Sequence, residues 1–165
     1  MVGGMRKTVV DVVGSVAAAL LIPIVQIFEG TVLVAQHDPI GIVTACHGDT
    51  RDVTLSQRFT REECRDRLEQ RLVEHAESVL RCTPGLTGHS YVLAAVVSFA
   101  YNIGPAAYCG STTAQRFNAG DWQGACRAMN ESDSGRLQWA TARGRVLPGL
   151  VKRRALERAL CERGL

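Results

Sequence analysis

The chain has 165 residues and a formal net charge of +3, and this length suits a single domain that can bury a core. A charge this small does not indicate a nucleic-acid-binding protein. The charge is uneven, because residues 136–163 hold eight arginines and lysines against two glutamates. Such a stretch either steers the protein toward an anionic polymer or surface, or forms a solvated helix face.

An apolar segment follows Arg6 and Lys7 near the N-terminus. Residues 12–28 contain no charged side chain. As one helix, the stretch from Thr8 to Phe28 would be about 31 Å long, which just spans the hydrocarbon core of a bilayer. The two basic residues in front of it predict that the N-terminus stays in the cytoplasm while the remainder of the chain crosses the membrane.

The hydrophobicity of this segment is low, because Asp11, Gly14 and several alanines dilute it. We expect an uncleaved, weak signal anchor over residues 1–28, followed by one domain over residues 29–165. Two alternatives are a cleaved signal peptide, for which residues 16–19 offer small side chains, and a buried core helix of the folded domain.

Six cysteines, all after the apolar segment, are widely spaced and form no CxxC pair. This pattern indicates three disulfides in an oxidising compartment, and the alternative is buried free thiols in a cytosolic protein. Six cysteines allow 15 pairings, so the spacing leaves their connectivity open. The cysteines are Cys46, Cys64, Cys82, Cys109, Cys126 and Cys161.

After the apolar segment, the chain first shows the pattern of a small β element. Apolar and polar residues alternate in places between residues 29 and 50, around a turn at Asp38-Pro39, which predicts a β-hairpin or small sheet. Thr60 and Glu63 then form a capping box for a helix that runs to about Arg81.

The remaining elements are predicted to be helices. Residues 89–102 are apolar nearly all round, as expected of a central buried helix. Shorter helices fit residues 111–118 and 121–129, and Pro148 would begin a last helix that ends near Cys161. The sequence therefore predicts an α+β fold that is mainly α.

Two carboxylates and a hydroxyl follow the apolar segment at fixed spacing. Eight residues separate Glu29 from Asp38, and five separate Asp38 from Thr44. Glycoside hydrolysis needs one carboxyl group that donates a proton and a second that is ionised. Glu29, beside Phe28, has apolar surroundings that suit a proton donor, whereas Asp38 lies in a solvated turn and can activate water held by Thr44. Most such trios are surface groups or helix caps.

This spacing resembles the active-site signature of phage endolysins, the phage-type lysozymes of glycoside hydrolase family 24. Their pattern is Glu, eight residues, Asp or Cys, five residues and Thr, and it recurs here at the same three residues. The similarity continues in residues 96–104, 111–126 and 145–161. It therefore covers nearly all of residues 28–162.

The resemblance implies a two-lobed, lysozyme-like fold with a small N-terminal β-sheet and a helical C-terminal lobe. It implies hydrolysis of the β-1,4 bond between N-acetylmuramic acid and N-acetylglucosamine in peptidoglycan, without a metal or cofactor. Glu29 would be the general acid, and Asp38 and Thr44 would handle the water. Tyr101 and Asn102 would line the glycan cleft, although core packing is an alternative for Tyr101. The alternative functions are a lytic transglycosylase and a non-catalytic glycan-binding protein.

The N-terminus is similar to that of the signal-anchor-release endolysins. In that subgroup the enzyme is tethered in the host inner membrane with its catalytic domain in the periplasm, and it becomes active on release. This chain has no cysteine in the anchor and has Asp38 at the second catalytic position. Release and refolding of the anchor, rather than disulfide exchange, are therefore the expected switch, and a monomer is the expected form. The matching motifs imply three disulfides, Cys46–Cys64, Cys82–Cys109 and Cys126–Cys161.

The chain departs from the commonest family pattern in two places. Asp49 stands where many relatives have a histidine, which leaves open whether a supporting ion pair is kept there. His47, nearby, is expected to be structural. The segment over residues 130–145 is longer and more polar than the usual link, so the resemblance does not predict its shape.

Overall fold

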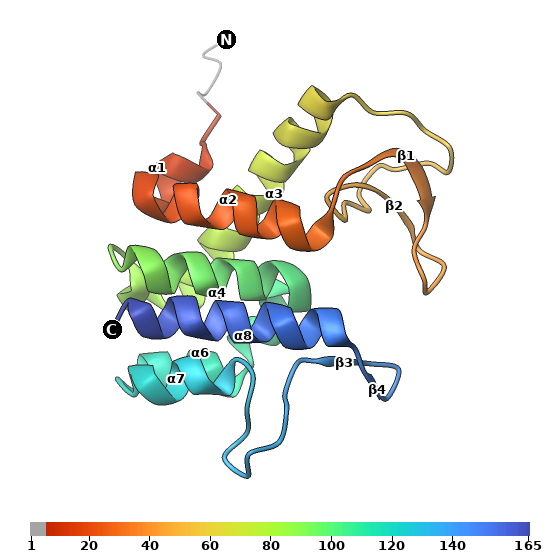
Figure 1. The fold of residues 1–165 in the computed structure, drawn as a ribbon. Coiled ribbons are helices and arrows are strands. Elements are labelled where there is room, and N and C mark those ends of the chain that lie inside the picture. Colours follow the sequence, from red (N-terminus) through yellow and green to blue (C-terminus); the bar gives the residue numbers. More distant parts are fainter. Residues whose placement is uncertain (1–5) are drawn as a thin grey trace.

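A computed structural model describes residues 6–165, which form a mainly helical protein with two short antiparallel hairpins (Figure 1). The predicted fold class is confirmed. The helices are α1 (Val9–Val13), α2 (Ser15–Glu29), α3 (Arg61–Cys82), α4 (Ser90–Ile103), α5 (Pro105–Cys109), α6 (Thr112–Asn118), α7 (Trp122–Ala128) and α8 (Pro148–Arg163). A single 3-10 turn covers Pro84–Leu86, and the strands are β1 (Val32–His37), β2 (Val43–Cys46), β3 (Thr141–Ala142) and β4 (Arg145–Val146).

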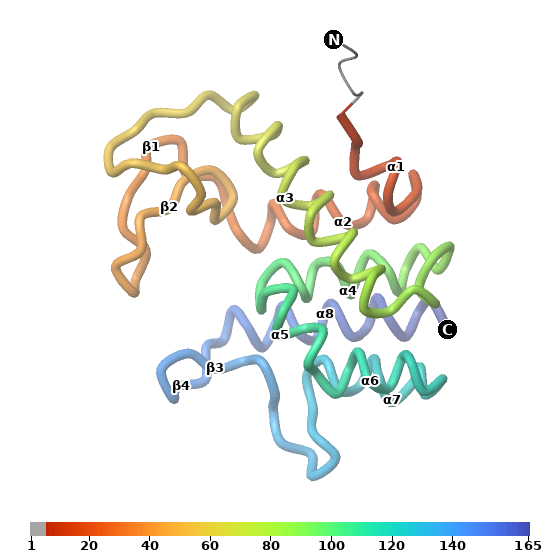
Figure 2. Tube along the Cα trace, turned by 180° about the vertical axis from the view of Figure 1, so that it is seen from behind, coloured from red at the N-terminus to blue at the C-terminus, as the bar shows by residue number. Residues whose placement is uncertain are grey.

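Helix α4 lies at the centre of the helical part, as the sequence predicted. Every residue from 92 to 100 is buried, and the helix packs against α2, α3 and α8 (Figures 1 and 2). Complete burial of one valine, leucine or phenylalanine side chain contributes about 1.5–3 kcal/mol. The core of the protein is therefore organised around this one helix.

The N-terminal apolar segment forms two helices that pack onto this core. Thr8 and Asp11 make a capping box at the start of α1, and Gly14, with φ of 86°, separates α1 from α2. Leu21 and Val25 of α2 are fully buried. Within residues 6–165, no helix has both the length and the hydrophobicity to cross a membrane. Residues 1–5 of the predicted anchor lie outside the described residues.

Both hairpins lie on the same side of the molecule (Figures 1 and 2). In the first, β1 pairs with β2, and Thr44 lies opposite Gln36. The second, β3–β4, belongs to the long segment whose shape the sequence did not predict. Its two-residue loop, Arg143-Gly144, has φ angles of 50° and 73°, as in the tight turns that match the twist of a hairpin.

Three disulfides connect the elements, and they are the pairs that the family resemblance implied. Cys46–Cys64 joins β2 to α3, Cys82–Cys109 joins α3 to α5, and Cys126–Cys161 joins α7 to α8; the Cα–Cα distances are 4.8, 5.6 and 5.6 Å. In the loop-entropy model, closing loops of this length stabilises a fold by about 3–4 kcal/mol each.

Candidate active site

Glu29 is the last residue of α2, and its carboxylate reaches the far C-terminal helix. Arg153 of α8 donates from Nη1 to Glu29 Oε1 at 2.5 Å. The side chain of Glu29 is 19% exposed. The surroundings are therefore less apolar than the sequence indicated, because a guanidinium lies against the carboxylate. On its other side, Oε2 faces Gly48, where a Cβ atom would lie only 3.0 Å away.

Arg153 is almost completely buried and is held at each of its nitrogens. Its Nε donates to Glu157 at 3.0 Å, and its Nη2 donates to the carbonyl oxygen of Ser98 at 3.1 Å. Its guanidinium also lies 5.3 Å from the ring centroid of Phe28, a cation–π distance. Because these contacts fix the guanidinium, they also fix the position of the Glu29 carboxylate.

The buried network continues from Glu157 to the cleft. Glu157 is fully buried and accepts from Ser98 Oγ at 2.7 Å and from Arg154 Nη1. Arg154 in turn donates to Asn102 Oδ1 and, at 3.0 Å, to the carbonyl oxygen of Trp139. Burial lowers the pKa of the Arg154 guanidinium, and the charge of Glu157 opposes that effect. One connected network of ion pairs and hydrogen bonds thus runs from Glu29 to Asn102.

Asp38 lies in the turn between β1 and β2. Its Oδ1 accepts hydrogen bonds from the backbone N–H groups of Ile40 at 2.9 Å and Ile42 at 2.8 Å. This turn, in which an aspartate bonds the backbone that follows it, fixes the orientation of the carboxylate. Asp38 is half-buried, so it remains accessible from the solvent side.

The two carboxylates line neighbouring recesses of one cleft. Glu29 and Arg153 line a recess of about 430 Å³, and Asp38 lines a second recess of about 810 Å³. Asn102 and Leu147 belong to the walls of both. An extended ligand that occupied both recesses would therefore contact the walls that hold Glu29 and Asp38. A glycosidase uses two carboxyl groups beside the bond that it cleaves.

The other predicted site residues lie in different places. Asn102 is in the cleft, but the Tyr101 hydroxyl donates to the carbonyl oxygen of His47 at 2.8 Å, and its ring lies 4.9 Å from that of His75. Burial raises the pKa of Tyr101. Tyr101 therefore packs within the protein, as the alternative interpretation proposed. Thr44 lies on β2 and outside the walls of both recesses.

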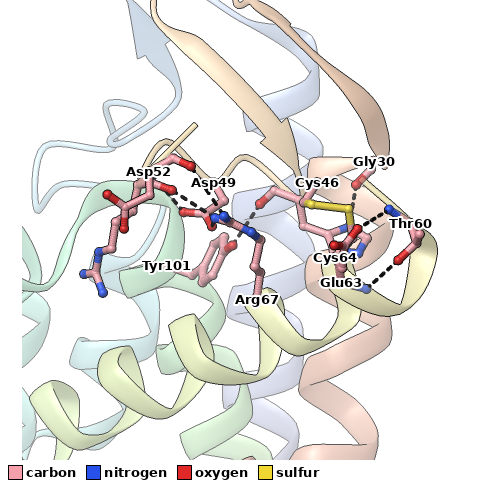
Figure 3. Close-up of a disulfide and its surroundings, with 11 residues drawn as sticks. Gly30, Cys46, Asp49, Asp52, Thr60, Glu63, Cys64, Arg67 and Tyr101 are labelled. Carbon is pink, nitrogen blue, oxygen red and sulfur yellow. Dashed lines mark hydrogen bonds and ion pairs between the residues drawn. A yellow bond between two sulfur atoms is a disulfide. The ribbon is translucent and has the colours of Figure 1, made fainter. Parts of the chain in front are cut away.

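Asp49 keeps an ion pair at the position where the chain departs from the family pattern (Figure 3). Its Oδ2 accepts from Arg67 Nη1 at 2.8 Å, and Arg71 Nε lies 3.8 Å from Oδ1. The acid is thus on the loop and the bases are on α3. His47 has the structural place expected of it, because its Nδ1 lies 2.6 Å from the carbonyl oxygen of Gly30.

Sequence reasoning missed Arg153, Arg154 and Glu157. Their spacing of three and four residues predicts ion pairs within one helix. It contains no signal for the contact with Glu29, which lies 124 residues away. The family resemblance covers these residues, but it did not predict that they belong to the site.

Known proteins resemble this chain over nearly its whole length. A protein-family model described as Phage lysozyme matches residues 26–157. A SAR-endolysin of Enterobacteria phage PA-2 is 28% identical over 169 residues, which cover 95% of this chain and 94% of that protein. A SAR-endolysin of Escherichia phage Mu is also 28% identical, over 80% of this chain and 72% of that protein.

Solved structures share the fold. The muramidase domain of SpmX from Asticaccaulis excentricus has a TM-score of 0.73 and 31% identity, over 89% of this chain and 97% of that one. The active form of P1 phage endolysin Lyz has a TM-score of 0.74 over 92% of this chain and 85% of that one. At 21% identity, the second similarity concerns the fold alone.

Proposed function

The chain belongs to the phage lysozyme family and is a peptidoglycan-lysing enzyme of the endolysin type, and from this premise we propose that it hydrolyses the β-1,4 bond between N-acetylmuramic acid and N-acetylglucosamine. Glu29 gives its proton to the leaving oxygen. Asp38 directs the attacking water. A role for Thr44 in holding that water rests on the family resemblance alone, because Thr44 lies outside the walls of both recesses. The product is cleaved peptidoglycan, and the consequence is lysis of the host cell.

The main support is the position of two separately held carboxylates along one cleft. Glu29 is held by a buried guanidinium, and Asp38 by two backbone N–H groups. Fixed groups need no reorganisation when the bond breaks, so they lower the barrier more than mobile ones. The larger recess lies between the two hairpins, and the recess that contains Glu29 adjoins it through Asn102 and Leu147.

The variant Glu29→Gln tests the role of the acid. We expect turnover of purified peptidoglycan to fall by about 10²–10⁴-fold, because the amide has no proton to give at the leaving oxygen. The fold should persist, since Arg153 keeps Glu157 and Ser98 as partners. Glu62→Gln, at an exposed carboxylate on α3, is the matched control. Full activity of Glu29→Gln would refute the assignment.

The alternative of a lytic transglycosylase differs in its product. Such an enzyme needs the acid but no water-directing aspartate, and it leaves anhydro-muramyl ends. Mass spectrometry of digested walls separates the two reactions, and reducing muramic acid ends are expected here. Asp38→Asn should also lower the rate, whereas a transglycosylase would tolerate it.

We also infer that residues 1–28 act as a releasable membrane anchor before they join the folded enzyme. A surface helix of a soluble protein normally has a charged or polar outer face. The outer face of α2 is instead apolar, and Val16 and Ile27 are 51% and 77% exposed. Folding of the domain does not require an apolar outer face on α2, whereas insertion of this segment into a bilayer does.

Two substitutions on this outer face test the anchor without disturbing the core. Ser15 and Ala19 are exposed in the folded protein, so Ser15→Leu/Ala19→Leu should strengthen insertion and delay lysis. The purified, folded variant should still cleave isolated peptidoglycan like the wild type. Val16→Lys, at another exposed position, should weaken insertion by about 2.5–3.5 kcal/mol. An unchanged membrane fraction and lysis time for the leucine variant would contradict release as the control step.

A further inference from the structure

Two arginines of the β3–β4 hairpin face the cleft and have no part in the chemistry described so far. Arg143 and Arg145 line the larger recess, together with Asp38 and Ile40 of the opposite turn. Both arginines are exposed. Within residues 6–165, neither guanidinium has a carboxylate oxygen within 4.0 Å, that of Asp38 included.

The turn holds Arg143 in a conformation that does not favour an arginine. Its φ is 50°, at the first of two loop positions where asparagine, aspartate and glycine are the usual residues. A side chain with a Cβ atom is disfavoured in this left-handed region. The needs of the hairpin turn therefore do not account for an arginine at position 143. A contact made by its side chain would account for it.

The charges around the recess define which ligand fits. Asp38 is the acidic group of the opposite wall, and its Oδ1 is already occupied by Ile40 and Ile42. Asn102, between the walls, is held by Arg154. The hairpin side is thus cationic and open to solvent. A guanidinium binds a carboxylate through two parallel hydrogen bonds, so this side suits an anionic group carried by an extended substrate.

We propose that Arg143 and Arg145 form a subsite for the carboxylates of the peptide stem attached to the muramic acid next to the cleaved bond. This inference rests on the proposed function, since it assigns a second part of the same substrate. The glycan strand occupies the cleft between Glu29 and Asp38, and the stem extends over the β3–β4 hairpin. The subsite makes the enzyme prefer peptidoglycan with charged stems over the same glycan with neutral ones.

The test compares two substrates and three double variants. The substrates are soluble, uncross-linked peptidoglycan strands and the same strands after carbodiimide-driven amidation with ammonia, which neutralises the stem carboxylates. Arg143→Gln/Arg145→Gln removes the subsite, and Arg143→Lys/Arg145→Lys keeps its charge. Arg127→Gln/Arg136→Gln removes two exposed arginines that do not line the recess and controls for net charge.

We expect amidation to lower kcat/KM of the wild type and of the control by about three- to tenfold, mainly through KM. The glutamine variant should cleave both substrates with equal efficiency, and the lysine variant should recover part of the preference. An equal response of the glutamine variant and the wild type to amidation would overturn the subsite. The subsite would also be overturned if the Arg127→Gln/Arg136→Gln control lost the preference for unamidated strands as fully as the glutamine variant. Failure of the wild type to cleave either substrate would instead refute the proposed function.

Discussion

Arg153 binds Glu29 across 124 positions of sequence, with 2.5 Å between Nη1 and Oε1. The Arg153 side chain is 3% exposed, and its guanidinium also donates to Glu157. The position of the predicted general acid is thus set by α8, a helix that ends on the opposite side of the protein from the two hairpins (Figure 1).

Replacement of the buried Glu157 carboxylate, which binds Arg153, should lower the stability of the fold. In Glu157→Gln, Arg153 and Arg154 lose their shared charged partner inside the core. We expect the free energy of unfolding to fall by about 3–5 kcal/mol, measured by denaturant titration. Glu162→Gln, at the exposed partner of Arg158 on the same helix, should cost at most about 1 kcal/mol. Equal losses would contradict the buried network.

A methyl group at Gly48 should disturb the acid directly. The added Cβ in Gly48→Ala would lie 3.0 Å from Glu29 Oε2, at a backbone φ of +75°. We expect kcat to fall by about 10- to 100-fold because the carboxylate must move. Gly120→Ala has a similar φ, +84°, but no atom within 4 Å of the new Cβ. It should lose stability without loss of kcat, and a similar kcat for both variants would argue against the contact.

Stability should decrease as the pH falls through the range in which His75 titrates. Burial lowers the pKa of His75 below its usual 6.5, so the unfolded chain binds a proton more readily than the folded one. The stabilising effect of the neutral ring is complete above about pH 6.5 and is lost as the pH falls toward the folded pKa. The difference in unfolding free energy between pH 7.5 and pH 5 should shrink in His75→Gln. An unchanged difference in His75→Gln would contradict this role of His75.

We expect Tyr101 to have a structural role and Asn102 to contact the substrate. Tyr101→Phe removes one hydrogen bond to the His47 carbonyl and should lower the free energy of unfolding by about 1 kcal/mol without a change in KM. Asn102→Ala changes the wall shared by both recesses and should raise KM. A raised KM for Tyr101→Phe would restore the role in the glycan cleft that the family resemblance implied.

Elements with local signals were predictable from the sequence. The capping box at Thr60 and Glu63 is present at the start of α3, and the apolar run over residues 89–102 is the buried α4. The division of the apolar segment at Gly14 was not predicted, because one long helix in a bilayer and two short ones on a protein core have the same composition. Nor was the β3–β4 hairpin, whose two-residue strands are too short to show alternation.

The same distinction holds for the candidate site. The spacing of Glu29, Asp38 and Thr44 is local and could be recognised, but the sequence could not predict what holds Glu29 in place. The ion pair of Asp49 with α3 is another long-range contact, 18 residues apart. Because Asp49 and its partners on α3 lie far apart in the chain, no local pattern reveals this ion pair. Catalytic roles for Glu29, Asp38 and Thr44 stay predictions.

The distance in sequence between Glu29 and Arg153 has a consequence for the timing of activity. During synthesis the acid is made early and its partner late, so a nascent chain that ends before α8 has no means of positioning the carboxylate in this way. Contacts this far apart also form slowly, because a long loop must close before they can stabilise the fold. An incomplete or partly folded copy therefore lacks the contact that holds the Glu29 carboxylate in place.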